Sequence, residues 1–213
     1  MILGPNYVYK CPHCSNLITT GSLVSGNTFG SVLYSDLKHV SLMLLEFPDY
    51  TSCEKCNSIF QLSKLKSIGS FEWNDESNPE WQEAQRAGFL TIDQYFSALK
   101  LGFGRKLTEE LYLRKMIWWK YNDRMRSGKQ IFDNSEDEVQ WTENCRVLIQ
   151  LLDDNNANHQ IMKSELHRNL ADFEQCVGMI DTLMKKELQW MKEKLMDECE
   201  KRNRWCVQLK PDL

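Results

Sequence analysis

Eight cysteines are the residues of this 213-residue chain whose type and spacing point most clearly to chemistry. Four of them form two Cys-x-x-Cys pairs, and the two-residue spacer lets both sulfurs of a pair turn toward one ion. Two such pairs supply the four thiolates of a tetrahedral zinc site. We therefore predict one structural Zn²⁺ held by Cys11, Cys14, Cys53 and Cys56, with no ligand position left for water or substrate.

The segments between and around the pairs leave alternatives open. The pairs are separated by the 38 residues 15–52, where common zinc ribbons have roughly 15–20, so we expect longer strands or an inserted hairpin. Redox chemistry is an alternative, because Cys-Pro-His-Cys also occurs at a helix N-terminus in thioredoxin-like disulfide oxidases. Residues 15–22 are rich in Gly, Ser and β-branched residues, which disfavours such a helix. His13 offers one more ligand atom, but we expect it to be exposed.

The composition is that of a folded protein, with 42% hydrophobic residues, seven Trp and a formal net charge of −4. No run of 18 apolar residues is long enough to span a membrane. The N-terminus lacks the basic and apolar regions of a secretory signal, so we expect a cytoplasmic protein without a disulfide framework. The remaining cysteines are expected to be small core residues: Cys145, Cys176, Cys199 and Cys206.

The pattern along the chain predicts an α+β protein in two parts. Residues 1–70 contain short apolar runs between turn residues, including 41–47, and predict a small β zinc ribbon. Residues 71–78 are polar, end before Pro79 and predict a linker. The charge also differs between the two parts. Residues 1–70 carry five Lys/Arg and four Asp/Glu, a net charge of +1, whereas residues 71–213 carry 21 Lys/Arg and 26 Asp/Glu, a net charge of −5.

Residues 79–213 predict a mainly α-helical domain. Capping boxes at 91–94 and 135–138 mark the starts of two helices, and a long amphipathic segment, 107–126, lies between them. A last helix is predicted from Asp172 to about Trp205, because its apolar residues recur every 11 positions and form one stripe. We expect this helix to pack on its neighbours; alternatively, its part after Lys185 pairs with a partner helix or a second copy of the chain.

Residues 166–180 resemble the middle of a tetratricopeptide repeat. Ala171 and Phe173 match the small and aromatic residues at the turn of that motif, and Cys176 and Ile180 match apolar positions of its second helix. No second copy lies about 34 residues away. The resemblance therefore implies packed helical hairpins, and one copy alone does not establish a repeat array.

A wider resemblance covers most of the chain. The segments Ser-Gly-Asn-Thr-Phe-Gly30, Tyr34-Ser-Asp36 and Glu46-Phe-Pro48, together with the two cysteine pairs, are similar to those of an uncharacterised bacterial family. Trp118-Trp119 and Asn122-Asp123-Arg124 fit the same family. That family couples a zinc ribbon to a tetratricopeptide-like helical domain, so the resemblance implies this architecture and no particular activity.

Most motifs of known enzymes are missing from the sequence. The four His are isolated, and neither His-Glu-x-x-His nor Gly-x-Ser-x-Gly occurs. We therefore predict a non-enzymatic protein-interaction adaptor or scaffold, in which a rigid zinc ribbon is joined to helical hairpins. The alternatives are a nucleic-acid-binding zinc-ribbon protein and an enzyme with an unrecognised site.

We expect the partner to be another protein, and we expect no binding to a membrane. Candidate partner-binding residues are Trp118, Trp119, Arg114 and Arg124, because aromatic and Arg side chains are enriched at binding hot spots. The alternative is that both Trp side chains pack in the core, since large aromatics usually supply core area.

The nucleic-acid alternative depends on three residues near the second cysteine pair. Phe60 would stack on a base, and Lys64 and Lys66 would contact phosphates. The net charge of only +1 over residues 1–70 weighs against this function, because phosphate contacts dominate affinity for nucleic acids.

Overall fold

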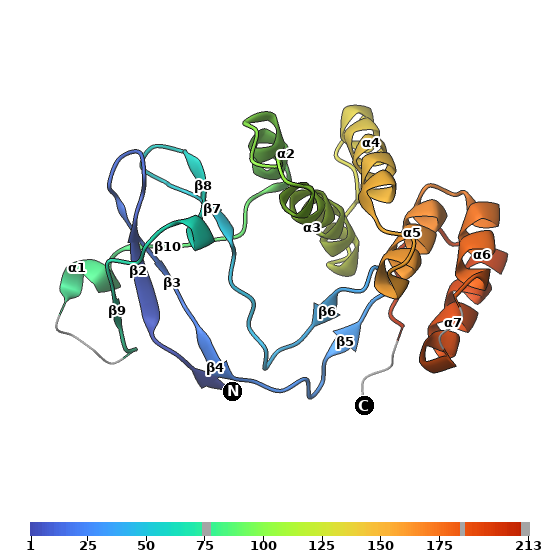
Figure 1. Cartoon of the computed structure of the whole chain (residues 1–213), viewed down its shortest axis with the longest axis horizontal. Coiled ribbons are helices and arrows are strands. Elements are labelled where there is room, and N and C mark those ends of the chain that lie inside the picture. The colour runs from blue at the N-terminus through green and yellow to red at the C-terminus, as the bar shows by residue number, and fades with distance from the viewer. Residues whose placement is uncertain (74–77, 184–185, 210–213) are drawn as a thin grey trace. The chain divides into compact units, whose positions relative to one another are not determined.

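The computed structural model describes residues 1–73, 78–183 and 186–209 and belongs to the mixed α+β class (Figure 1). Packing divides the chain into two compact units. Unit 1 comprises Met1–Gly30 and Ser41–Gln94, and unit 2 comprises Ser31–Val40 and Tyr95–Leu213. One segment of the predicted ribbon range thus packs with the helices, and residues 79–94 pack with the strands. Of the predicted linker, residues 74–77 lie outside the described residues.

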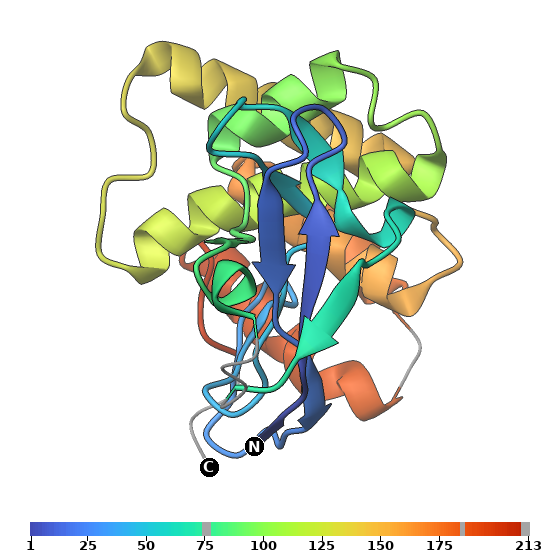
Figure 2. The same cartoon turned by 90° about the vertical axis from the view of Figure 1, so that its left-hand side faces the viewer.

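Unit 1 consists of short strands: β1 (Ile2–Leu3), β2 (Asn6–Lys10), β3 (Leu17–Thr20), β4 (Leu23–Ser25), β7 (Tyr50–Ser52), β8 (Ile59–Gln61), β9 (Gly69–Phe71) and β10 (Gln85–Arg86). The main sheet has the order β10-β3-β2-β9, with β10 parallel to β3 and the other pairs antiparallel. Figure 2 shows β2 and β3 side by side. The hairpins β2–β3 and β7–β8 each carry one cysteine pair in the connecting turn.

The core of unit 1 surrounds the buried cysteines. Ile18, Phe60 and Leu62 form one apolar cluster with Cys11 and Cys53. Such a small core buries little apolar surface, so cross-linking by a metal is the usual supplement in domains of this size.

The segment after β9 closes unit 1. The short helix α1 (Pro79–Gln82) begins at Pro79, as predicted, because Pro fits the first helical position. The ring of Trp81 lies over Gly69, where an added Cβ would come within 2.3 Å of the indole. The predicted capping box at 91–94 is confirmed, because the Thr91 and Gln94 side chains each bond the other's backbone N–H at 3.2 and 2.9 Å. A 3₁₀ turn covers Leu62–Lys64.

Helices make up most of unit 2: α2 (Ile92–Lys100, whose first turn belongs to unit 1), α3 (Leu107–Arg126), α4 (Ser135–Leu151), α5 (Ala157–Asn169), α6 (Phe173–Asp181) and α7 (Gln189–Glu200), with a 3₁₀ turn at Lys186–Leu188. The bounds of α3 match the predicted 107–126. The predicted capping box at 135–138 is wrong by one residue, because Asn134 caps α4 and its Oδ1 accepts from the Asp137 N–H at 3.0 Å. None of the helices in the described ranges is long and apolar enough to cross a membrane.

The predicted single helix from Asp172 to about Trp205 is wrong. Instead α6 ends at Asp181 and α7 begins at Gln189, and Met184 of the predicted stripe lies outside the described residues. Two helices bury the stripe better than one, because its residues close around Ile161 of α5. The resulting cluster consists of Ile161, Ile180, Leu183, Met191, Leu195 and Leu209.

A β-hairpin from the N-terminal part of the chain belongs to unit 2. It is formed by β5 (Val32–Leu33) and β6 (His39–Val40), and Leu33 packs on the apolar cluster of α5, α6 and α7. The predicted strand at 41–47 is wrong, because these residues form turns and expose several apolar side chains. Their apolar run therefore does not reflect burial in a sheet.

Two residues at the turn of this hairpin enter a buried polar network. Asp36 is fully buried, pairs with Arg126, and accepts a hydrogen bond from Asn122 Nδ2 at 2.8 Å. Ser35 donates to Glu165 Oε1 at 2.7 Å, and Glu165 also pairs with Arg168 through two bonds of 2.7 and 2.9 Å. The network thus ties the hairpin to α3 and α5 of unit 2.

Candidate metal centre

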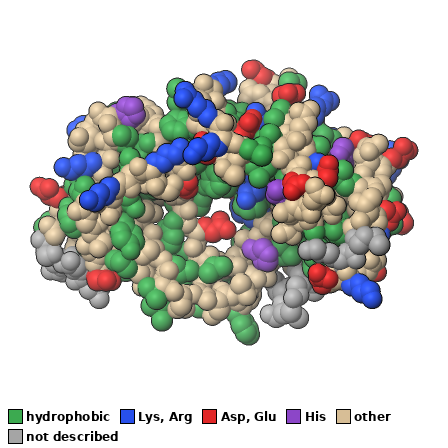
Figure 3. Space-filling model, in the orientation of Figure 1, with side chains coloured by type: hydrophobic (Ala, Val, Ile, Leu, Met, Phe, Trp, Pro, Cys, Tyr) green, Lys and Arg blue, Asp and Glu red, His purple; other side chains and the backbone are tan. Residues whose placement is uncertain are grey.

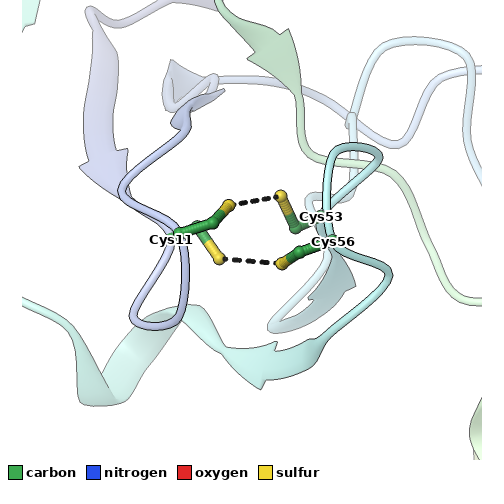
Figure 4. Close-up of side chains that lie close together, drawn as sticks. Cys11, Cys53 and Cys56 are labelled. Atoms are coloured by element: carbon green, nitrogen blue, oxygen red, sulfur yellow. Dashed lines mark hydrogen bonds between the residues drawn. The ribbon is translucent and has the colours of Figure 1, made fainter.

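The four cysteines of the two pairs form one cluster. Their sulfur atoms all lie within 4.8 Å of one another, although the pairs are more than 38 residues apart in the sequence. The Sγ atoms of Cys11 and Cys56 are 3.6 Å apart, and those of Cys14 and Cys53 are also 3.6 Å apart. Figure 4 shows the sulfurs of the two turns facing one another. The cluster is therefore positioned to bind a metal ion.

These distances fit a tetrahedral thiolate site. With Zn–S bonds of about 2.3 Å, a regular tetrahedron has edges of about 3.8 Å. Cys11 and Cys53 are buried, Cys14 is half-buried and Cys56 is exposed, so the site lies at the edge of the core. His13 is exposed and does not belong to the cluster. Four sulfurs fill the coordination sphere that such an ion prefers, and no ligand position remains for a substrate.

The two cysteine turns share one backbone geometry. In the first, the Cys11 carbonyl accepts from the Ser15 N–H at 2.9 Å and the Cys11 N–H donates to Asn16 at 2.8 Å. In the second, Cys53 makes the equivalent bonds with Asn57 at 2.7 Å and Ser58 at 2.9 Å.

The residue after each pair has a positive φ, 60° at Ser15 and 57° at Asn57. Asn adopts this left-handed conformation more readily than most residues do. Each turn therefore curls around its own two sulfurs through local bonds, so the short motif is sufficient to shape it.

The thiols do not ionise alike in the absence of a cation. Burial raises the pKa of Cys11, but hydrogen bonds from Ser58 and from the backbone N–H groups of His13 and Cys14 lower that pKa more, to about 6. The Asn16 N–H lowers the pKa of Cys14, whereas burial and the hydrogen bonds with the other three thiols raise that pKa to about 12. A divalent cation removes the conflict, because it stabilises all the thiolates at once.

Gln85 braces both turns from the parallel strand β10. Its Nε2 donates to the Ser52 carbonyl at 2.7 Å, and its Oε1 accepts from the Glu54 N–H at 2.9 Å and from Asn16 Nδ2 at 3.5 Å. Gln94 adds a bond of 3.1 Å to Ser52 Oγ. Gln85 could not be predicted as part of the site, because it lies 29 residues after the second pair and no local motif marks it.

The candidate partner-binding residues of α3 do not form one surface. Trp118 is fully buried, and its Nε1 donates to Asn169 at 2.8 Å, so it offers no surface to a partner. Trp119 is half-buried and donates to the Asp36 carbonyl at 3.0 Å. Arg124 pairs with two acidic side chains before and within α4. Arg114 lies in a surface groove of unit 2.

The three residues of the nucleic-acid alternative differ in how far they are buried. Phe60 is only 4% exposed and packs in the core of unit 1, so its ring is not free to stack on a base. Lys64 and Lys66 are exposed. Unit 1 as a whole carries five Lys/Arg and nine Asp/Glu, a net charge of −4. Its surface therefore lacks the basic character that phosphate binding requires.

Comparison of the chain with models of protein families, with curated proteins and with solved structures gives no match. The assignment of this cluster as a metal site thus rests on the geometry of the four cysteines. The resemblance to the bacterial family is supported for these cysteines alone, and its finer architecture stays a prediction.

Proposed function

We propose that the cysteine cluster holds one structural Zn²⁺, and that the chain is a non-enzymatic protein-interaction adaptor built from a zinc ribbon and a tetratricopeptide-like helical domain. The observation that carries the zinc assignment is the convergence of four sulfurs within 4.8 Å. A tetrahedral set of four soft thiolates favours Zn²⁺ over hard cations such as Mg²⁺ and Ca²⁺. A closed site of this kind supports folding rather than catalysis.

The adaptor function is supported by a groove on unit 2 where α2, α3 and α4 meet. It has a volume of about 530 Å³ and is lined by three apolar side chains, Phe96, Leu99 and Val139, and by five polar or charged residues. Val139 is 67% exposed, although it is apolar. A hollow of this size and composition accommodates large side chains of a bound segment.

A buried amide on the wall of this groove has an unused acceptor. Asn144 is fully buried, and its Nδ2 donates to the Arg114 carbonyl at 3.0 Å. This bond fixes the amide orientation and leaves Oδ1 without a hydrogen-bond partner in the part of the chain that the structure describes. An unsatisfied buried acceptor costs about 1–3 kcal/mol. Because Oδ1 is itself buried, a donor on a bound group recovers that cost only where it reaches beneath the groove surface.

The partner that fits these features is an amphipathic helix of another protein. Apolar side chains at helical spacing would enter the groove beside Phe96, Leu99 and Val139. Lys100 at the margin favours an acidic residue on the same helix, although Glu143 lies there too and Arg114 is already paired with Glu110 at 2.8 Å. Burial of Phe60 and the acidity of unit 1 weigh against the nucleic-acid alternative.

Site-specific cross-linking tests this proposal. A photoreactive amino acid in place of Val139 should trap a protein, and the recombinant form of that protein should bind the full chain directly. The Val139→Glu variant should then bind at least tenfold more weakly, whereas Ile68→Glu, which changes an exposed residue of unit 1, should bind normally. Equal affinities of wild type and Val139→Glu would contradict the proposal, as would trapped nucleic acid.

A further inference from the structure

Unit 1 exposes a set of large apolar side chains near β4. Phe29 is 82% exposed, Leu42 is 80% exposed and Val24 is 68% exposed, and Leu44, Leu45 and Phe47 are each more than a third exposed. We call these six residues the apolar surface. Figure 3 shows hydrophobic side chains in green along the lower margin of the molecule, where Figure 1 places β4 and the chain that follows it. A contiguous patch of this extent marks an interaction site in most soluble proteins.

Close packing joins the two segments that carry the apolar surface. A Cβ added at Gly26 would lie 2.4 Å from the Met43 carbonyl and 3.0 Å from Leu44 Cδ1. A Cβ added at Gly21 would lie 2.6 Å from the ring of Phe47. Glycines at these two positions therefore allow residues 41–47 to lie directly against residues 21–26. Leu44 and Phe47 therefore pack against the segment that carries Val24.

The apolar surface is nearly free of charge. No Lys, Arg, Asp or Glu occurs from residue 11 to residue 35, and Glu46 is the only charged residue of 41–47. The rest of unit 1 is acidic, since the whole unit has a net charge of −4. A patch with Glu46 as its one charge meets a copy of itself with less like-charge repulsion than the rest of the acidic unit would.

The extent of the apolar surface matches what a dimer needs. At roughly 200 Å² for a fully exposed large apolar residue, the six residues expose on the order of 700 Å². One partner of a standard interface contributes about 800 Å². A two-fold axis places the same patch on both chains, so a single self-complementary surface is sufficient.

We infer that the apolar surface is an interface with a second copy of this chain, and that the protein is a dimer through unit 1. This interface is separate from the groove on unit 2, so either proposal can fail without the other. A lipid surface is the less favoured occupant, because the acidic unit has no basic margin to attract anionic headgroups.

Sedimentation equilibrium of the zinc-loaded full chain tests the inference. Interfaces of this size have micromolar or tighter affinity, so at about 10 µM the species should have twice the chain mass of 25.1 kDa. Phe29→Asp and Leu42→Asp should each weaken the dimer at least a hundredfold, because each places a charge in an apolar contact. Leu107→Asp, at a residue of unit 2 that is 60% exposed, should leave the dimer unchanged.

Three results would overturn the inference. The first is a monomer at all concentrations up to solubility. The second is a dimer that survives both Asp substitutions while zinc content and ellipticity show that the variants are folded. The third is co-sedimentation of the monomer with phosphatidylcholine vesicles that is lost in Phe29→Asp, which would assign the surface to a lipid instead.

Discussion

Units 1 and 2 are each organised around a polar cluster, but the two clusters are assembled differently. In unit 1, each pair of sulfurs comes from one turn, and backbone bonds spanning at most five residues shape that turn. In unit 2, Asp36 forms an ion pair with Arg126, which lies 90 residues later. Ser35 donates a hydrogen bond to Glu165, which lies 130 residues later. Local geometry forms the first cluster, whereas only the complete tertiary structure brings the second together.

The clusters also differ in how their charge is balanced. Four clustered thiolates repel one another and need a cation from outside the chain. The carboxylates of Asp36 and Glu165 are neutralised by Arg126 and Arg168 of the same chain. Burial raises the pKa of Glu165, and the adjacent Arg168 and Ser35 oppose that rise. With the proposed zinc, unit 1 would depend on a metal for its charge balance, whereas unit 2 balances its buried carboxylates within the chain.

The largest expected effect follows removal of one sulfur. Cys53→Ser should abolish zinc binding and loosen unit 1, because structural zinc contributes about 10–16 kcal/mol to the folding of small domains. Far-UV ellipticity should fall little, since the helices are mostly in unit 2. Cys145→Ser, in α4, should retain a full equivalent of zinc. Equal metal content in Cys53→Ser and wild type would contradict the account.

Removal of one partner of the buried ion pair in unit 2 should destabilise the helices and leave zinc binding unchanged. Asp36→Ala leaves the buried Arg126 without its main partner, which typically costs about 3–5 kcal/mol. Urea unfolding followed by ellipticity should show this loss, while zinc content stays at the wild-type value. The control Asp133→Ala removes an exposed ion pair with Arg124 and should cost less than about 1 kcal/mol. Equal losses in the two variants would show that burial of Asp36 is unimportant.

A smaller and pH-dependent effect is expected at Glu198 of α7. Burial raises its pKa, but Asn203, Lys194 and Lys201 lower that pKa more, to about 2. The ionised carboxylate therefore stabilises unit 2 above the unfolded pKa of about 4.3, and this contribution disappears as the pH falls toward 2.

Glu198→Gln tests that contribution. The variant should lose about 2 kcal/mol relative to wild type at pH 7, and the difference should vanish near pH 2. Urea midpoints of both proteins across this range give the comparison. A difference that is independent of pH would contradict the electrostatic explanation.

The smallest effect is expected where the metal site depends on a distant side chain. Gln85→Ala removes the brace between the two turns and should weaken zinc affinity about 10–100-fold, as loss of outer partners does at other metal sites. Competition with a chromogenic chelator measures this change. Gln175→Ala, at an exposed position of α6, should bind zinc as wild type does. An unchanged affinity in Gln85→Ala would show that the turns are self-sufficient.

Features with short-range causes could be predicted from the sequence. The convergence of the four sulfurs was predicted from the spacing of the Cys-x-x-Cys pairs and is confirmed. The start of α2 was predicted from Thr91 and Gln94, whose reciprocal bonds span three residues. In each case the physical cause lies within a few residues of its effect.

Features with long-range causes could not be predicted. The 11-residue period of the last segment fits one straight helix as well as two packed ones, and burial around Ile161 selects the second arrangement. The apolar run at 41–47 resembles a buried strand, but tertiary packing leaves Leu42 exposed. The burial of Asp36 could not be predicted either, because it depends on Asn122 and Arg126 of α3, which lie far along the chain.

Metal and thiol stoichiometry tests the central claim most directly. The full chain, purified without added metal or chelator, should contain about one Zn²⁺ per molecule. Chelation should release that ion and make four further thiols reactive, which peptide mapping should place at Cys11, Cys14, Cys53 and Cys56. A metal-free chain with a reactive Cys11, or a Cys11–Cys14 disulfide, would contradict the structural zinc site and favour redox chemistry instead.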